Sequence, residues 1–201
     1  MRPRLIAITD LSLATEDEHA ASYASLAAAL PDGALAIQLR GHGIEARRLL
    51  SFGELLRARV PGATLLVNDR LDVALALAAE GVHLGERSVD VADARRLLSP
   101  HAWISVAVHG DVVPAGANAA LVSPIFASPG KGEPRGLSAL RAARAASPGV
   151  ALYALGGVTA ATVAVCVATG ADGVAVIRAA LFDVASLAQA VREVEPRSRV
   201  D

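Results

Sequence analysis

Short apolar runs alternate with longer amphipathic stretches along almost the whole chain. Eight of these runs consist mainly of Val, Ile, Leu and Ala, and most are continuous rather than alternating in polarity. Continuous apolar runs are typical of parallel strands that are covered on both faces. We therefore predict strands at Leu5–Thr9, Ala34–Leu39, Thr64–Asn68, Gly81–Leu84, Trp103–His109, Ala119–Ser123, Val150–Leu155 and Gly173–Ile177.

The stretches between these strands carry the apolar spacing of helices. Thr159 and Asp183 stand where N-caps are expected. Helices are also expected to end just before Pro31, Pro61 and Pro148. The predicted helices cover residues 15–30, 44–59, 70–79, 89–98, 137–146, 159–169 and 183–194.

This alternation of strands and helices is typical of βα units on a parallel sheet. Eight evenly spaced units in 201 residues favour a closed barrel over a doubly wound open sheet, and no Gly-x-Gly-x-x-Gly follows the first strand. The link at 110–117 is short and interrupted by glycine and proline. We predict a single-domain (β/α)8 TIM barrel over residues 1–201, with a short or missing fifth helix.

Composition and charge narrow the class of protein. The chain is 53% hydrophobic, and its net charge of −1 gives no field that would attract nucleic acid or an anionic membrane. Leu5–Ile8 is too short for a signal peptide, and no uncharged stretch reaches the ~18 apolar residues of a membrane helix. Cys166, the single cysteine, lies in an apolar stretch, which predicts a buried thiol and no internal disulfide. We expect a cytoplasmic protein; the sequence leaves the oligomeric state open, with a homodimer as one option.

Polar residues close or follow each predicted strand, and in such barrels the carboxyl ends of the strands meet at one functional face. Gln38 and Arg40 are separated by Leu39 and point to the same side, roughly 6.6 Å apart. A guanidinium can grip a phosphate with two hydrogen bonds, and a glutamine amide can contact a heterocycle or a phosphate oxygen. The alternative is a ring of salt bridges that only neutralises the barrel mouth.

Asn68 and Asp69 follow the third predicted strand and open a helix. An amide and a carboxylate beside an anion site suit Mg²⁺, which takes few protein oxygens together with substrate phosphates. The alternative is that Asp69 serves only as the N-cap of the helix.

Residues 123–136 form the longest stretch without predicted structure, and they contain Lys131, the only lysine of the chain. Long loops in compact domains are commonly functional. We predict a lid in which Ser128, Lys131 and Arg135 fold over a pyrophosphate; the alternative is a solvated loop with an incidental lysine.

Gly156 and Gly157 end the seventh strand and precede a helix. Their backbone N–H groups would face the barrel mouth and could cradle a phosphate, as the loops after strands seven and eight do in this class of barrel.

Two of the histidines end predicted strands. His83 and His109 could act as a general acid or base, or be structural histidines with satisfied hydrogen bonds. His19 and His101 are expected at the surface. No pair of histidines has the spacing of a zinc site.

The ordered series of motifs resembles the thiamine phosphate synthase and thiazole tautomerase family, and the resemblance spans almost the entire chain. The matching segments are Ile8-Thr9-Asp10, Ile37-Gln38-Leu39-Arg40, residues 67–74 (Val-Asn-Asp-Arg-Leu-Asp-Val-Ala), residues 81–85 (Gly-Val-His-Leu-Gly), Ser123-Pro124-Ile125-Phe126, residues 154–158 (Ala-Leu-Gly-Gly-Val) and residues 170–176 (Gly-Ala-Asp-Gly-Val-Ala-Val).

The resemblance implies that, in the synthase, a pyrimidine carbocation forms as Mg²⁺-bound pyrophosphate departs. The nitrogen of thiazole phosphate then captures this carbocation. The barrel then stabilises charge and positions the substrates. The same resemblance implies the following roles: Arg40, Asn68 and Lys131 hold pyrophosphate, Asp69 binds Mg²⁺, Gln38 and Ser128 contact the pyrimidine or pyrophosphate, and Gly157 meets the thiazole phosphate. We predict Gly156 as a further substrate-binding residue. We predict Arg40, Lys131 and His109 as the catalytic residues.

Several positions depart from the family pattern. His42 replaces a lysine, and Ser88 replaces a second Mg²⁺ carboxylate that Glu86 or Asp90 could supply only if their loop shifted. Further departures are Ala107 for a serine that contacts pyrophosphate, Gly130 for a hydroxyl residue of the lid, and Pro124 for the tautomerase histidine.

We favour synthase-type coupling. One alternative is a tautomerase-like paralogue that works without metal and uses His109 or His42. The other is a barrel that binds thiazole phosphate or thiamine phosphate without turnover.

Overall fold

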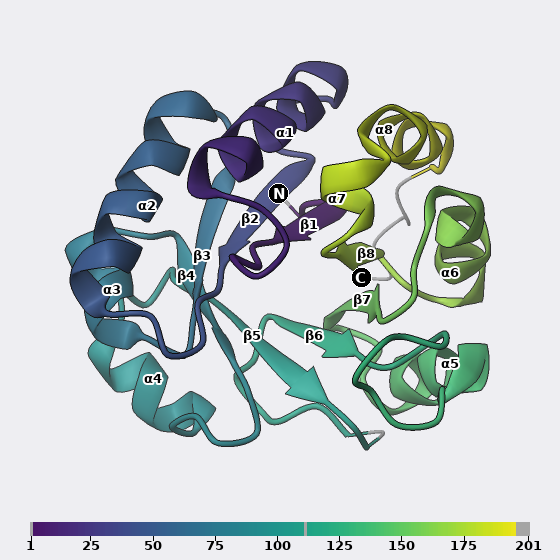
Figure 1. Ribbon diagram of the computed structural model, residues 1–201. Coiled ribbons are helices and arrows are strands. Elements are labelled where there is room, and N and C mark those ends of the chain that lie inside the picture. Colours follow the sequence, from purple (N-terminus) through teal and green to yellow (C-terminus); the bar gives the residue numbers. More distant parts are fainter. Residues whose placement is uncertain (1, 111, 196–201) are drawn as a thin grey trace.

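A computed structural model describes residues 2–110 and 112–195, so the ends of the predicted 1–201 domain lie outside the described residues. The strands form one closed parallel barrel in chain order (Figure 1). Each predicted strand is confirmed to within one residue at either end. The strands are β1 Leu5–Ile8, β2 Leu35–Leu39, β3 Thr64–Asn68, β4 Gly81–Leu84, β5 Trp103–Val108, β6 Ala119–Val122, β7 Ala151–Leu155 and β8 Gly173–Val176.

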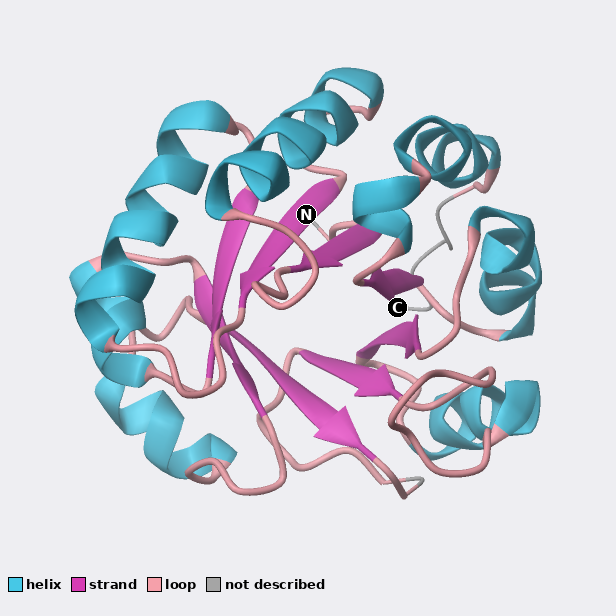
Figure 2. Cartoon of the chain, viewed as in Figure 1, coloured by secondary structure: helices cyan, strands magenta, loops and turns pink. Residues whose placement is uncertain are grey.

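The barrel closes where the first strand meets the last. Leu5 of β1 is in register with Leu35 of β2 on one side and with Val174 of β8 on the other. The (β/α)8 barrel is therefore confirmed and the doubly wound open sheet is wrong. Helices surround the ring of strands (Figure 2), and none of those in the described part of the chain is long and apolar enough to span a bilayer.

The helices agree with the predicted segments, apart from one addition. Among the described residues between β5 and β6 there is no helix, as predicted. A four-residue helix after β8 was not predicted. The helices are α1 Glu16–Ala29, α2 Ala46–Arg59, α3 Leu71–Ala76, α4 Val91–Leu97, α5 Gly136–Ala146, the 3₁₀ helix η1 Ala160–Thr162, α6 Val163–Thr169, α7 Ala179–Phe182 and α8 Val184–Glu193.

Local chemistry fixes several helix ends. Thr15 and Glu18 form a capping box at the start of α1. The N–H of Thr159 donates to Thr162 Oγ at 3.0 Å, which closes the first turn of η1. Asp183 is the N-cap residue of α8, as predicted, although its side chain makes no capping hydrogen bond. The three prolines each follow a helix end by two residues, as predicted.

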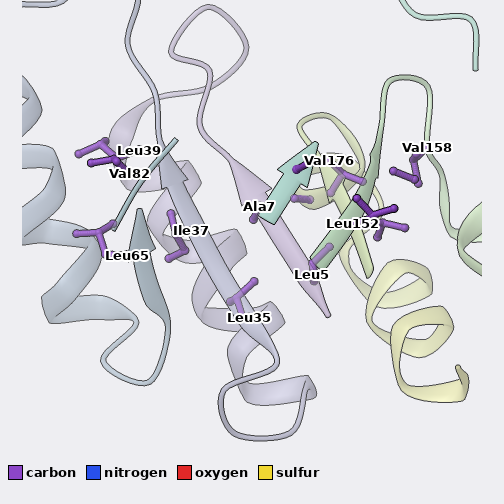
Figure 3. Packing of buried hydrophobic residues seen from close by; sticks show 14 of the residues in the cluster. Leu5, Ala7, Leu35, Ile37, Leu39, Leu65, Val82, Leu152, Val158 and Val176 are labelled. Atoms are coloured by element: carbon purple, nitrogen blue, oxygen red, sulfur yellow. The ribbon is translucent and has the colours of Figure 1, made fainter. Parts of the chain in front are cut away.

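Side chains alternate along the strands between two hydrophobic layers. On β1, Leu5 and Ala7 belong to the outer layer that packs against the helices (Figure 3). Ile6 and Ile8 instead belong to a separate cluster in the barrel interior. Burying a leucine or isoleucine contributes roughly 1.5–3 kcal/mol. The predicted burial of Cys166 is confirmed, and burial raises the pKa of its thiol to about 11.

The inner row of side chains becomes polar toward the carboxyl ends of the strands. Ala36 belongs to the inner cluster, and Gln38 is the next residue of that row on β2. On β3, Asn68 follows Leu66 in the same way and lies in register with His83 of β4. Gln38 and His83 are buried. The strand pattern thus places a polar layer at one end of an apolar barrel.

Candidate functional site

A cavity of about 690 Å³ opens at the carboxyl ends of the strands. Arg40 enters its wall from the end of β2, and Ser128 and Lys131 enter from the loop between β6 and α5. Gly156 and Gly157 form another part of the wall, directly after β7. The fold therefore gathers five predicted site residues from three separate segments around one space.

Some residues of this cavity were not assigned a site role from the sequence, and some predicted residues lie elsewhere. Asp10 and Arg178 line the cavity, and both belong to the polar residues that close or follow the predicted strands. Phe182 lines it from α7, which was not predicted. Four predicted site residues lie outside its lining: Gln38, Asn68, Asp69 and His109.

The Arg40 guanidinium is held by neighbours on two sides. Its Nη1 lies 3.6 Å from the Asp10 carboxylate, and its Nε donates to His42 Nε2 at 3.0 Å. The Arg40 backbone is tied to β1, because its N–H donates to Thr9 Oγ at 2.7 Å and its carbonyl accepts from the same hydroxyl at 2.8 Å. Arg40 thus forms one salt bridge at the mouth, where the alternative expects a ring of them, and the same guanidinium also lines the cavity. A cation with few accessible orientations is suited to binding an anion.

Gln38, Asn68 and Asp69 form a hydrogen-bonded chain beside this cavity. Gln38 Nε2 donates to Asn68 Oδ1 at 3.0 Å, and Asn68 Nδ2 donates to Asp69 Oδ2 at 2.6 Å. Gln38 Oε1 is buried and has no partner among the described residues. An unpaired buried acceptor costs about 1–3 kcal/mol, so this oxygen is a candidate acceptor for a ligand N–H.

The Asp69 carboxylate turns toward the β4–α4 loop. Its Oδ1 accepts from the N–H of Gly85 at 3.1 Å and from the Ser88 hydroxyl. Burial raises the pKa of Asp69, but hydrogen bonds from Ser88, Gly85 and Asn68 and the nearby His83 lower it overall. Asp69 therefore carries a negative charge at neutral pH.

The N-cap interpretation of Asp69 is wrong. The residue at the N-cap of α3 is Arg70, and the Asp69 carboxylate is engaged by Gly85 and Ser88 on another loop instead. Asp69 has a φ of 61°, in the left-handed region that only short polar residues and glycine adopt readily. This backbone conformation is unfavourable for most residues, and the contacts of the directed side chain retain it at the strand end.

A magnesium ion would find one carboxylate here. Ser88 hydrogen-bonds to Asp69 and supplies no second charge, and Asp90 stands at the N-cap of α4. Glu86 Oε1 lies 3.6 Å from His109 Nε2 on the exposed side of the loop. Within the described ranges, no group of three His, Cys, Asp or Glu residues could hold a metal. The residues fit Mg²⁺ only as a one-carboxylate site completed by phosphate oxygens and water.

The two glycines of the cavity wall are required by close packing. Gly156 and Gly157 have φ values of 93° and 64°. A Cβ added at Gly157 would lie 2.4 Å from the carbonyl oxygen of Ala127. The N–H of Phe126 donates to the Gly156 carbonyl at 2.9 Å, so the β6–α5 loop is tied to the end of β7. The glycines predicted to cradle a phosphate therefore pack directly against the loop predicted to be a lid.

One residue of the predicted lid does not line the cavity. Arg135 donates to the carbonyls of Val108 at 3.4 Å and Gly110 at 3.2 Å, at the end of β5. The prediction that Arg135 folds over the ligand is wrong, because these carbonyls hold its guanidinium elsewhere. Lys131 remains at the cavity, on a turn in which its N–H donates to the Ser128 carbonyl at 3.2 Å.

The histidines differ in their surroundings. His83 is buried, its Nδ1 lies 3.0 Å from Ser105 Oγ, and burial lowers its pKa to about 4. These contacts favour the structural interpretation of His83. His109 is partly exposed beside Glu86. His101 is exposed as predicted, but His19 is fully buried, so its predicted surface position is wrong.

Comparisons with known proteins agree on one family. A family model described as thiamine monophosphate synthase matches residues 5–180. A thiamine-phosphate synthase from Moorella thermoacetica is 42% identical over 184 residues, which cover 85% of this chain and 87% of that protein. One from Methanoculleus marisnigri is 42% identical over 202 residues, which cover 94% of this chain and 93% of that protein.

Solved structures show the same fold. The thiamine phosphate pyrophosphorylase from Pyrococcus furiosus superposes with a TM-score of 0.79 at 28% sequence identity, covering 94% of this chain and 96% of that one. A 3-hexulose-6-phosphate synthase superposes with a TM-score of 0.66 at 19% identity, covering 94% of this chain and 96% of that one, and this likeness shows the fold alone.

The packing of Gly157 predicts a loss of anion binding when it gains a side chain. In Gly157→Ala the new methyl group displaces Ala127 and with it the loop that carries Ser128 and Lys131. We expect the affinity for inorganic pyrophosphate, measured by calorimetry, to fall at least about tenfold, or about 1.4 kcal/mol. Gly62→Ala is the control, because a Cβ there meets open space. Unchanged affinity in Gly157→Ala would contradict the cradle.

The buried His83 predicts a pH-dependent stability. Its pKa falls from 6.5 to about 4 on folding, so the unfolded chain binds more protons between these values. The free energy of unfolding should therefore decrease as the pH is lowered from about 6.5 to about 4, by a total of about 3 kcal/mol from this group. Urea denaturation across this range should show a shallower decrease in His83→Gln than in the wild type. Parallel curves would contradict the assignment.

Proposed function

This chain belongs to the thiamine monophosphate synthase family, and we propose that it couples hydroxymethylpyrimidine pyrophosphate with thiazole phosphate to give thiamine phosphate and pyrophosphate. One observation carries the proposal: a single cavity gathers Arg40, Lys131 and the Gly156-Gly157 backbone from different strand ends. Two phosphorylated substrates require two anion-binding regions in one space, and this wall offers both.

The pyrophosphate end of the first substrate is assigned to Arg40, Ser128 and Lys131. The guanidinium and the ammonium group supply positive charge, and the Ser128 hydroxyl supplies a donor. As the carbon–oxygen bond breaks, its electron pair passes to the pyrophosphate, and the two cations stabilise this growing charge. Because Arg40 is already held by Asp10 and His42, little reorganisation is needed during the reaction.

The pyrimidine is assigned to the end of β2. Gln38 has a fixed orientation because its amide nitrogen donates to Asn68, which leaves its buried oxygen to accept from an amino group. The inner row of β2 places Gln38 two residues before Arg40. A substrate whose pyrophosphate contacts Arg40 would then direct its ring toward the barrel interior.

The thiazole phosphate is assigned to the wall formed after β7 and β8. Gly156 and Gly157 present backbone without side chains, and Arg178 adds a cation from the end of β8. This is the usual phosphate position in (β/α)8 barrels. A phosphate bound there directs the thiazole nitrogen across the cavity, where its lone pair forms the new bond to the methylene carbon.

We assign Asp69 as the single protein carboxylate for Mg²⁺, with pyrophosphate oxygens and water completing its coordination. When bound, the ion would neutralise part of the charge of the leaving group. The positions of Asn68 and Ser88 beside Asp69 keep its carboxylate oriented. No role in coupling is proposed for His109, which lies outside the cavity lining and whose Nε2 faces Glu86 on the exposed side of the β4–α4 loop.

The names of the relatives favour coupling over the tautomerase and carrier alternatives. Both relatives described above are named thiamine-phosphate synthases. At the position where the tautomerase histidine is expected, Pro124 has no group that could transfer a proton.

Incubation of the protein with both substrates and Mg²⁺ should yield thiamine phosphate, detected by chromatography together with equimolar pyrophosphate. We expect Arg40→Ala and Lys131→Ala each to lower kcat/KM by about 10²–10³-fold, because each removes a charge that faces the leaving group. Arg96→Ala, which changes an exposed arginine on α4, should behave like the wild type. Absence of product from correctly folded wild-type protein would contradict the function.

Removal of the Asp69 charge should weaken magnesium binding. In Asp69→Asn, we expect the affinity for Mg²⁺ in the presence of pyrophosphate to fall about tenfold or more, measured by calorimetry. Asp72→Asn is a matched control, since Asp72 is exposed and pairs only with Arg70 among the described residues. Equal affinities for Mg²⁺ in Asp69→Asn and the wild type would refute this ligand.

A further inference from the structure

A buried polar pair on α1 has no part in the assignments above. His19 and Tyr23, one turn apart on α1, are both fully buried. His19 Nδ1 lies 3.1 Å from the Tyr23 hydroxyl, and the ring of Phe52 from α2 packs against the imidazole at 5.9 Å between centroids. Buried polar side chains are costly unless they are hydrogen-bonded, and these two lie within hydrogen-bond distance of each other.

The other nitrogen of this imidazole reaches the cavity wall. His19 Nε2 lies 3.2 Å from the backbone nitrogen of Asp10 and 3.1 Å from its carbonyl oxygen. Burial lowers the pKa of His19, with only partial opposition from Asp10 and Glu18. The neutral ring can donate to the carbonyl or accept from the N–H of Asp10, according to its tautomer. In either state it fixes the backbone at the point where β1 ends.

The anchored residue in turn holds the central cation of the site. The Asp10 carboxylate accepts from the N–H of Ser12 at 3.1 Å and from its hydroxyl at 2.6 Å, and its other oxygen faces Arg40 Nη1 at 3.6 Å. Asp10, Ser12 and Arg40 all line the cavity. A continuous series of contacts therefore runs from the Tyr23 hydroxyl through the His19 ring and Asp10 to the guanidinium.

We propose that His19 is a positioning residue, which together with Tyr23 fixes Asp10 and thereby orients Arg40 for the pyrophosphate group of the substrate. The proposal rests on the function proposed above. Without the imidazole, the backbone of Asp10 loses this partner and its carboxylate drifts from Arg40. The guanidinium then keeps only His42 as a side-chain partner among the described residues. A cation with more accessible orientations binds the same anion more weakly.

Three variants test the proposal. His19→Leu keeps a similar volume and removes both hydrogen bonds, whereas His19→Gln can still donate to and accept from Asp10. Tyr23→Phe removes only the hydroxyl. The readouts are the steady-state constants and the ¹H–¹⁵N signal of Arg40 Nε. His101→Leu, at an exposed histidine, is the control.

We expect His19→Leu to shift the Arg40 Nε signal and to lower kcat/KM about tenfold, with most of the loss in the KM of the pyrophosphorylated substrate. His19→Gln should restore kcat/KM to within about threefold of the wild type, and Tyr23→Phe should give a smaller shift in the same direction. An unchanged Arg40 signal in His19→Leu and Tyr23→Phe, or a loss in His19→Gln as large as in His19→Leu, would overturn the proposal. If neither the wild type nor any variant couples the substrates but the Arg40 signal still shifts in His19→Leu, the proposed function fails and the positioning role stands.

Discussion

The pairing of β1 with β8 is the constraint on which the site depends. Once β1 pairs with both β2 and β8, with Leu5 in register with Leu35 and Val174, the sheet has no free edge and all its carboxyl ends form one ring. Arg40 and Lys131 are far apart in the chain. They line the same cavity because the strands that precede them, β2 and β6, belong to that ring. An open sheet would leave them at separate positions along an edge.

The second physical requirement is the change from apolar to polar residues along the inner rows. Ile6, Ala36 and Leu66 fill the barrel with hydrocarbon, and the rows then continue as Gln38 and Asn68. A polar layer next to a hydrocarbon core is stable only when its members bond to one another. Here the polar side chains hydrogen-bond to one another largely in pairs. These hydrogen bonds give the side chains fixed orientations before any ligand binds. The one buried oxygen of Gln38 without a partner is the exception that points to a ligand.

The fold could be predicted because strands in a closed barrel are covered on both faces and therefore leave continuous apolar runs. The same signal located Arg40 and Gly157, since a strand end is visible where apolar residues stop. Loop geometry was less accessible. Arg135 is held by backbone carbonyls at the end of β5, and no local pattern specifies such a contact. Asp69 resembled an N-cap because its positive φ, which turns the carboxylate away from α3, cannot be read from residue types.

His19 was misjudged for a related reason. A polar residue on an alanine-rich helix is usually exposed, and α1 has only a weak division into polar and apolar faces. The spacing of His19 and Tyr23, one helical turn apart, was the available signal that two polar groups could satisfy each other inside the protein. Pair spacing on weakly amphipathic helices thus carries information that single-residue hydropathy lacks.

One anion site forms from segments that only barrel closure brings together. A titration of ¹⁵N-labelled protein with inorganic pyrophosphate, followed by backbone amide chemical shifts, shows whether these segments bind the same anion. We expect the largest saturable changes to fall together on Arg40, Ser128, Lys131 and Gly157, with one common dissociation constant. Changes confined to one of these segments, or centred on residues outside the barrel mouth, would contradict it.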